Sequence, residues 1–229
     1  MDDDATPTSQ EISDAIADIG WRLILGAVQT YVPVPSLATA AAVASVAASA
    51  AGDDGDGHLD IDLRAGRAVL RLMDSRTGAT TVRDLRIASQ ITEALAAQGF
   101  PTVPESADDV VVQELEIAID ALDIAAIRPF WAAVTGYVDG AGRLDDGPAL
   151  VDPLHLGPTI WFQQMDAPRP QRNRIHFDIG VPHDAAAARL EATLAAGGVL
   201  LSDARAPAFW VLADPEGNEA CICTWQARD

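Results

Sequence analysis

The strongest constraint on how this chain folds is an arrangement of elements that occurs twice after residue 110. Each copy predicts a strand, an amphipathic helix and three further short strands, an order written βαβββ. In the first copy the pattern predicts a strand over 114–119, a helix over 123–135 and a closing strand over 159–164. Because an internal repeat fixes an architecture, we expect two open, curved sheets, each backed by one helix, round a shared cavity.

The second copy opens with the stretch 173–181, in which apolar and polar residues alternate as in a half-buried strand. Its apolar positions, Ile175, Phe177 and Ile179, are expected to face a helix. The opposite face carries three polar residues, which must meet either water or a site: Arg174, His176 and Asp178. The remaining expected elements are a helix over 184–196, strands over 199–201, 209–213 and 220–225, and a turn over 214–218.

Four segments of the two copies carry a resemblance to a known family. They are FWAA at 130–133, WFQQ at 161–164, NRIHFD at 173–178 and LADPEGNE at 212–219. Together they resemble the vicinal-oxygen-chelate superfamily, the glyoxalase and bleomycin-resistance type, over residues 112–227. The resemblance implies a glyoxalase-like enzyme, or a binding protein, for a small oxygenated molecule.

The resemblance also implies a set of metal ligands on the first and last strands of each unit. Carried over to this chain, the ligands are Glu114 or Glu116, Gln164 or Gln163, His176, and Glu219. Such a set suits a divalent ion such as Mn, Fe, Ni or Zn and leaves positions for two substrate oxygens. The expected pocket lining adds two tryptophans to Glu116 and Gln163, namely Trp161 and Trp210. The alternative is a metal-free cavity in which His176 bonds a neighbouring carboxylate.

The first hundred residues predict a different domain, an antiparallel sheet with helices on one face. The expected elements are a helix capped by Ser9, an alternating segment over 21–32, a helix over 37–51, strands over 59–63 and 67–73, and a helix ending near residue 98. This order resembles pterin-4a-carbinolamine dehydratase over residues 10–98.

The active site of that family uses a His-His-Pro-Asp run and a later His. Removal of water from a carbinolamine needs one group that donates a proton and another that accepts one. Here the run stands as Gly57-His58-Leu59-Asp60, and Ser75 occupies the place of the later His. The resemblance therefore leaves His58 and Asp60 as the remaining catalytic residues. We expect a degenerate domain that assists assembly or covers the pocket; retained dehydratase (lyase) activity is the alternative.

Charge limits the partners. The chain holds 34 acidic and 15 basic residues, a formal net charge of -19. Because an anionic surface repels phosphates and acidic lipids, we expect a small-molecule ligand and neither nucleic acid nor membrane as a partner. The N-terminus is acidic and no long apolar run occurs, so we expect a cytoplasmic protein; we also expect a homodimer.

The two cysteines and two of the histidines are predicted to be structural or exposed. Cys221 and Cys223 point to one face of the final strand, a spacing that suits neither a disulfide nor, alone, a zinc site, and we interpret them as small core residues. His155 and His183 stand in loops and are expected at the surface.

The whole sequence thus predicts an α+β protein with domains at 9–99 and 111–229 and a linker over 100–110. Three functions stay open. They are a glyoxalase-like enzyme or binder with or without a divalent metal, a 4a-hydroxytetrahydrobiopterin dehydratase, and a resistance-type protein that sequesters its ligand without chemistry.

Overall fold

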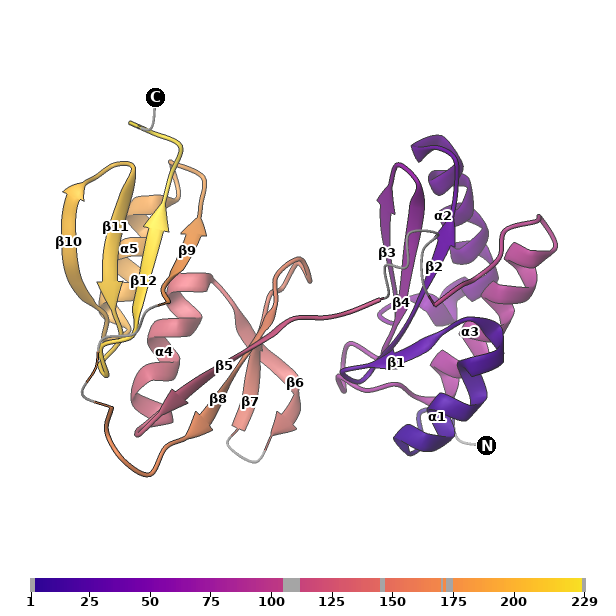
Figure 1. The fold of residues 1–229 in the computed structure, drawn as a ribbon, viewed down its shortest axis with the longest axis horizontal. Coiled ribbons are helices and arrows are strands. Elements are labelled where there is room, and N and C mark those ends of the chain that lie inside the picture. Colours follow the sequence, from indigo (N-terminus) through magenta and orange to yellow (C-terminus); the bar gives the residue numbers. More distant parts are fainter. Residues whose placement is uncertain (1–2, 105–111, 145–146, 170, 172–174, 228–229) are drawn as a thin grey trace. The chain divides into compact units, whose positions relative to one another are not determined.

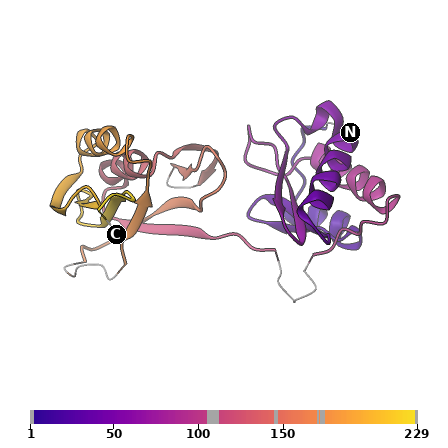
Figure 2. The ribbon, with the colours of Figure 1, turned by 90° about the horizontal axis from the view of Figure 1, so that it is seen from above.

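The computed structural model describes residues 3–104, 112–144, 147–169, 171 and 175–227. The chain divides into two compact units, Met1–Glu114 and Leu115–Asp229. Each unit gathers its helices on one side of its strands (Figures 1 and 2). Among the described residues, no helix combines the length and the apolar character needed to span a membrane.

The first unit is one antiparallel sheet of strand order β1-β2-β4-β3 covered by helices (Figure 1). Its strands are β1 (Arg22–Ile24), β2 (Ala27–Pro33), β3 (Leu59–Arg64) and β4 (Arg67–Leu72). Its helices are α1 (Ser9–Ile16), η1 (Ala17–Ile19), α2 (Leu37–Ala51), η2 (Gly52–Gly55) and α3 (Val82–Ala96). Small residues on one stripe of α2, among them Ala40, Val43 and Ala47, are buried, so this helix lies close on the sheet. The predicted antiparallel sheet with helices on one face is confirmed.

Two local features of this unit differ from the sequence prediction. The alternating segment over 21–32 is a hairpin rather than one strand, because Leu25 and Gly26 both take positive φ values, 47° and 84°, and turn the chain. The first helix is capped by Thr8 rather than Ser9, since Thr8 and Glu11 form a capping box.

The linker predicted over 100–110 begins later than expected. Phe100 packs against the core of the first unit, and the Thr102 hydroxyl donates to the carbonyl of Ile19 over 2.7 Å. Val103 and Tyr31 exchange backbone hydrogen bonds of 2.9 Å. Residues 100–104 are therefore part of the first unit, since their backbone and side chains are bonded to it. Residues 105–111 lie outside the described part of the chain.

The second unit contains two βαβββ modules, as the repeat predicts. In the first module the sheet order is β5-β8-β7-β6, and in the second it is β10-β11-β12-β9. The first module consists of β5 (Glu116–Ala121), α4 (Ile124–Thr135), β6 (Val138–Leu144), β7 (Gly147–Val151) and β8 (Thr159–Gln164). The second consists of β9 (Phe177–Gly180), α5 (Ala186–Ala195), β10 (Val199–Arg205), β11 (Phe209–Ala213) and β12 (Glu219–Cys223). In both modules the first and last strands pair in parallel, so residues far apart in sequence become neighbours.

The predicted turn over 214–218 joins the two modules. Asp214 is 2 % exposed, and its carboxylate accepts hydrogen bonds from the Trp131 indole and from the backbone of Glu216. The Glu216 carboxylate in turn accepts the N–H groups of Leu122 and Asp123 at the start of α4. These bonds fix the β11–β12 hairpin, and with it the strand that carries the cysteines, against the helix of the other module.

Candidate functional site

The candidate site lies on the open face of the second module's sheet. On β12, Ala220 and Ile222 are buried in the core of the unit. Phe177 and Ile179 of β9 pack against the same core. Because successive side chains of a strand point to opposite faces, the residues that alternate with these core residues face away from the helices. These residues are His176, Asp178, Cys221 and Cys223.

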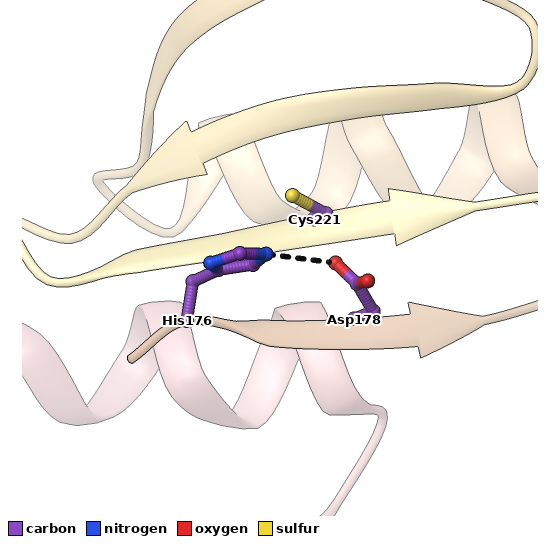
Figure 3. A group of neighbouring side chains, drawn as sticks. All are labelled: His176, Asp178 and Cys221. Atoms are coloured by element: carbon purple, nitrogen blue, oxygen red, sulfur yellow. Dashed lines mark ion pairs between the residues drawn. The ribbon is translucent and has the colours of Figure 1, made fainter. Parts of the chain in front are cut away.

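Three of these side chains form a compact group (Figure 3). The register places Cys221 directly beside Asp178 on the parallel neighbouring strand, and His176 stands two residues earlier. His176 Nε2 lies 3.5 Å from Asp178 Oδ1. One ligand atom from each of His176, Asp178 and Cys221 can be chosen so that the nitrogen, the oxygen and the sulfur lie within 4.8 Å of one another. The group therefore brings three different kinds of ligand atom to one point.

A cavity of about 530 Å³ opens beside this group. Its lining residues are His176, Asp178, Arg205, Ala208, Phe209, Cys221, Cys223 and Ala227. The lining combines an imidazole, a carboxylate, a guanidinium and two thiols with an aromatic ring, which is the mixture of polar and apolar groups found in small-molecule sites. All of these residues belong to the second module or the segment that follows it.

The environment of Cys221 is anionic. Burial raises the pKa of its thiol to about 12, and a hydrogen bond to Asp178 together with the negative charges of Asp178, Cys223 and Glu219 acts in the same direction. A bound dication would reverse this effect, since its charge offsets those of the surrounding groups. The site therefore holds the thiol protonated when no cation is bound.

Glu219 stands on the same strand two residues before Cys221, and its charge reaches that thiol. Since Ala220 pairs with Phe177, Glu219 lies at the level of His176. The convergence of the Glu219 and His176 side chains in one coordination sphere stays a prediction.

The predicted ligand and pocket residues of the first module separate into two groups. On β5, Glu116 precedes the core residue Ile117. On β8, Trp161 and Gln163 stand on either side of the core residue Phe162. Because side chains alternate along a strand, Glu116, Trp161 and Gln163 face away from the helices. Gln164 does not: its amide donates to the backbone carbonyls of Ala121 and Leu122, over 3.3 and 2.9 Å. That amide is engaged in fixing the end of the strand.

Two further predicted residues lie elsewhere than expected. Glu114 precedes β5 and forms an ion pair with Arg71 of the first unit over 3.0 Å, and it also accepts a hydrogen bond from Gln29. The strand that the sequence placed at 114–119 begins at Glu116 because Glu114 is held by these partners. Trp210 packs against the core of the second unit, whereas its neighbour Phe209 lines the cavity. The alternation of β11 thus gives the pocket position to Phe209.

The predicted catalytic residues of the first unit do not lie together on one face. His58 Nδ1 lies 2.8 Å from Asp84 Oδ1, and both side chains are buried. Asp60 is exposed on β3, 3.4 Å from the guanidinium of Arg71. The partner of His58 is therefore Asp84, in the first turn of α3.

Sequence reasoning assigned no functional role to Asp178, Arg205, Phe209 or Cys221. Asp178 and Cys221 were each recognisable as polar or thiol residues on the face opposite the apolar alternation. The missing signal was the parallel pairing of the first and last strands, which brings the two residues side by side. His155 and His183 are exposed, as predicted.

Comparison with known proteins supports the glyoxalase-like prediction for the second unit. Residues 116–223 match the family model of the glyoxalase-like domain. No curated protein matches the chain. The prediction of a glyoxalase-like region is confirmed by the family match, and the resemblance of the first unit to the dehydratase stays a prediction.

Several solved structures are similar to about half of this chain. A glyoxalase/bleomycin resistance protein/dioxygenase family enzyme from Burkholderia phytofirmans is 20 % identical with a TM-score of 0.40, covering 48 % of this chain and 95 % of that one. A glyoxalase-related enzyme from Fulvimarina pelagi is 19 % identical with a TM-score of 0.39, covering 49 % and 88 %. The fosfomycin resistance protein FosX from Mesorhizobium loti is 9 % identical with a TM-score of 0.41, covering 50 % and 93 %.

Proposed function

We propose that the second unit is a glyoxalase-like enzyme or binding protein for a small oxygenated molecule, which it holds in the cavity beside β9 and β12. The observation that carries the proposal is the convergence of His176, Asp178 and Cys221 at the edge of that cavity. Except for Ala227, the residues that line the cavity lie within the range that matches the glyoxalase-like family model. Its volume, about 530 Å³, suits a small organic ligand.

The lining residues have distinct roles in this proposal. Arg205 offers a planar guanidinium that binds carboxylate or phosphate oxygens through two parallel hydrogen bonds. Phe209 covers the apolar part of the ligand. His176 and Asp178 face the ligand with an imidazole and a carboxylate whose Nε2 and Oδ1 atoms lie 3.5 Å apart. An anionic small molecule with an apolar portion is the ligand that fits these groups.

We further propose a divalent ion as the cofactor. The donor atoms of His176 and Asp178 are of the kinds that divalent transition metals accept. When bound, such an ion polarises the oxygens of the substrate. The protein's own contribution is to present His176 and Asp178 side by side and to cover the ligand with Phe209.

Ligand binding to the full-length protein tests this function. Thermal unfolding is followed with a panel of small carboxylates and phosphonates, each with and without Mn²⁺, Ni²⁺ or Zn²⁺. We expect one class of anion to raise the unfolding temperature and His176→Ala to abolish the effect. The matched control is His183→Ala, an exposed histidine of the same unit outside the cavity lining. Failure of every anion, or equal loss in both variants, would contradict the proposal.

Sequestration without chemistry is distinguished from catalysis by the fate of the ligand. If the ligand is recovered unchanged after long incubation with stoichiometric protein, the second unit is a binding protein. If it is converted, the unit is an enzyme, and His176→Ala should then reduce kcat more than it reduces ligand affinity, because an interaction made only in the transition state affects kcat.

For the first unit we propose an assembly role without dehydratase turnover. The positions of the two missing imidazoles are neighbours, since a Cβ built on Gly57 would lie 3.3 Å from the Ser75 hydroxyl oxygen. His58, the remaining imidazole, is paired with a buried carboxylate. An assay with a 4a-carbinolamine pterin checks this: we expect turnover at least tenfold below that of an intact dehydratase, about what one lost acid–base group costs at minimum.

A further inference from the structure

We propose that the ion bound in this cavity is zinc, held by His176, Asp178 and Cys221 rather than by the His176 and Glu219 pair that the family resemblance implies. The inference rests on the proposed function to the extent that it uses the same cavity. The inference adds two things to the proposed function. It names the ion, and it names the thiol of Cys221 as the ligand that selects this ion.

The geometry supports this set of three ligands. Asp178 and Cys221 are directly paired on parallel strands, so their side chains leave the sheet at the same level and on the same face. Tetrahedral zinc with bonds near 2.0–2.3 Å separates its ligand atoms by about 3.5 Å. His176 Nε2 and Asp178 Oδ1 are 3.5 Å apart, and all three ligand atoms lie within 4.8 Å. Small rotations about side-chain bonds suffice to close the set round an ion.

Figure 3 shows the three side chains on one side of the two strands, with the His176 ring and the Asp178 carboxylate facing each other and the Cys221 sulfur near both. The His176 and Asp178 side chains are 53 % and 63 % exposed. An ion therefore has a path from solvent to the buried thiol. Three protein ligands would leave one position of a four-coordinate zinc ion for another ligand, which is the ligand number of catalytic rather than structural zinc.

The chemistry of the ligand atoms selects the metal. A thiolate is a soft ligand that favours zinc strongly over manganese or magnesium, whereas carboxylates and imidazole alone discriminate much less. On binding, the Cys221 thiol releases its proton to solvent. The thiolate and the Asp178 carboxylate then carry two negative charges, which balance the two positive charges of the ion.

The chain supplies a matched control for the thiol. Cys223 lies one pleat farther along the same face of β12, beside Gly180, and lines the cavity outside the group of three. The chain has two cysteines in all, so every thiol-to-metal signal reports on this cavity. Cys223→Ser therefore makes the same chemical change as Cys221→Ser on the same face of β12, at a position outside the group of three.

The experiment is a Co²⁺ titration of the reduced, full-length protein without a histidine tag, followed by displacement with Zn²⁺. We expect one equivalent of Co²⁺ to produce a thiolate-to-cobalt charge-transfer band together with tetrahedral visible bands, and Zn²⁺ to remove both. Cys221→Ser should abolish the charge-transfer band, and Asp178→Asn should weaken Co²⁺ binding about 10-fold or more. Cys223→Ser and Glu219→Gln should keep both the band and the affinity within about 3-fold.

Three results would overturn the inference. They are the absence of Co²⁺ binding, binding without the charge-transfer band, and loss of the band in Cys223→Ser but not in Cys221→Ser. Circular dichroism of each variant identifies one that fails to fold; Cys221→Ala then replaces Cys221→Ser. The anion-dependent rise in unfolding temperature is measured in the same samples. If the anion still raises the unfolding temperature but no cobalt signal appears, the zinc inference fails and the proposed function stands. If cobalt binds with the charge-transfer band but no anion raises the unfolding temperature, the proposed function fails and the zinc inference stands.

Discussion

Each unit of this protein contains a His–Asp pair, and the two pairs differ in burial. In the first unit, His58 Nδ1 lies 2.8 Å from Asp84 Oδ1, with side chains 9 % and 0 % exposed. In the second, His176 Nε2 lies 3.5 Å from Asp178 Oδ1, with side chains 53 % and 63 % exposed. The same two chemical groups are thus sealed into the fold in one unit and open to a ligand in the other.

The other partners of each carboxylate explain the difference. The second oxygen of Asp84 accepts hydrogen bonds from the backbone N–H and the hydroxyl of Thr81, so the carboxylate caps helix α3. Asp178 instead stands beside Cys221 at the cavity. Asp178 follows His176 closely in the sequence, whereas Asp84 lies 26 residues after His58. The burial and the additional partners decide that Asp84 holds the fold together and that Asp178 is available for binding.

The largest expected effect is the loss of stability on removal of Asp84. Asp84→Ala leaves His58 without its partner and the Thr81 donors unsatisfied inside the first unit, so we expect a loss of about 3–5 kcal/mol in the free energy of unfolding. Asp178→Ala should cost no more than about 0.5 kcal/mol, since its site is exposed. Unfolding of the first unit can be followed through the NMR signal of Trp21, which is the tryptophan of that unit and is buried. Equal costs for the two variants would refute the distinction between the pairs.

Removal of a buried carboxylate from the second unit tests whether the loss of unfolding free energy depends on the burial of the carboxylate or on the unit that contains it. Asp214→Ala removes the acceptor for the Trp131 indole and for backbone groups of the turn that follows β11. We expect a loss of about 3 kcal/mol, measured by urea unfolding. Glu216→Ala, an exposed acid of the same turn, is the control and should cost about 1 kcal/mol. If the order of these two costs is reversed, burial is not the controlling variable.

A smaller effect is expected where the first unit departs from the dehydratase motif. Gly57 has φ of +74°, a conformation that disfavours any residue with a Cβ, so Gly57→His should lower the stability of the first unit by about 1 kcal/mol. Ser75→His, at a neighbouring exposed position without that constraint, should change stability by less than about 0.5 kcal/mol. Denaturant midpoints of the two variants provide the comparison; a neutral Gly57→His would show that the turn accommodates the imidazole that the motif requires.

The smallest expected effect concerns acid stability near His58. Burial acts to raise the pKa of Asp74, but the Arg76 backbone hydrogen bond and the charges of Arg76 and His58 outweigh it and leave the pKa below its ordinary value. A carboxylate whose pKa is lowered by folding stabilises the folded state above its unfolded pKa, and this stability is lost as the pH falls through the folded pKa. Asp74→Asn should therefore make the stability of the first unit less dependent on pH below about pH 4. An unchanged slope of stability against pH would contradict this assignment.

Much of the fold followed from the sequence because apolar alternation and helix periodicity are strong local signals. The strand β8, the strand β11 and the helix α2 have the expected bounds, and the paired modules are present. The hairpin at Leu25 and Gly26 was missed because a leucine with positive φ carries no sequence signal.

The site was harder to predict because it depends on which strands become neighbours. Alternation placed His176 and Asp178 on one face and Cys221 on one face of another strand, but only the parallel register joins them. The same limitation placed Trp210 in the pocket instead of Phe209, and assigned Gln164 as a ligand although its amide binds the backbone. A one-residue shift of register exchanges the two faces of a strand, so predictions of pocket residues are far more sensitive than predictions of elements.

The most direct test of the difference between the two His–Asp pairs is an NMR titration of the histidine ring nitrogens. The full-length protein contains four histidines, so the spectrum of their imidazoles resolves both pairs in one sample. On addition of one equivalent of Zn²⁺, we expect the ring signals of His176 to shift and those of His58 to stay unchanged. A shift of the His58 signals, or unshifted His176 signals at saturating Zn²⁺, would contradict the assignment of the buried pair to the fold and the open pair to the site.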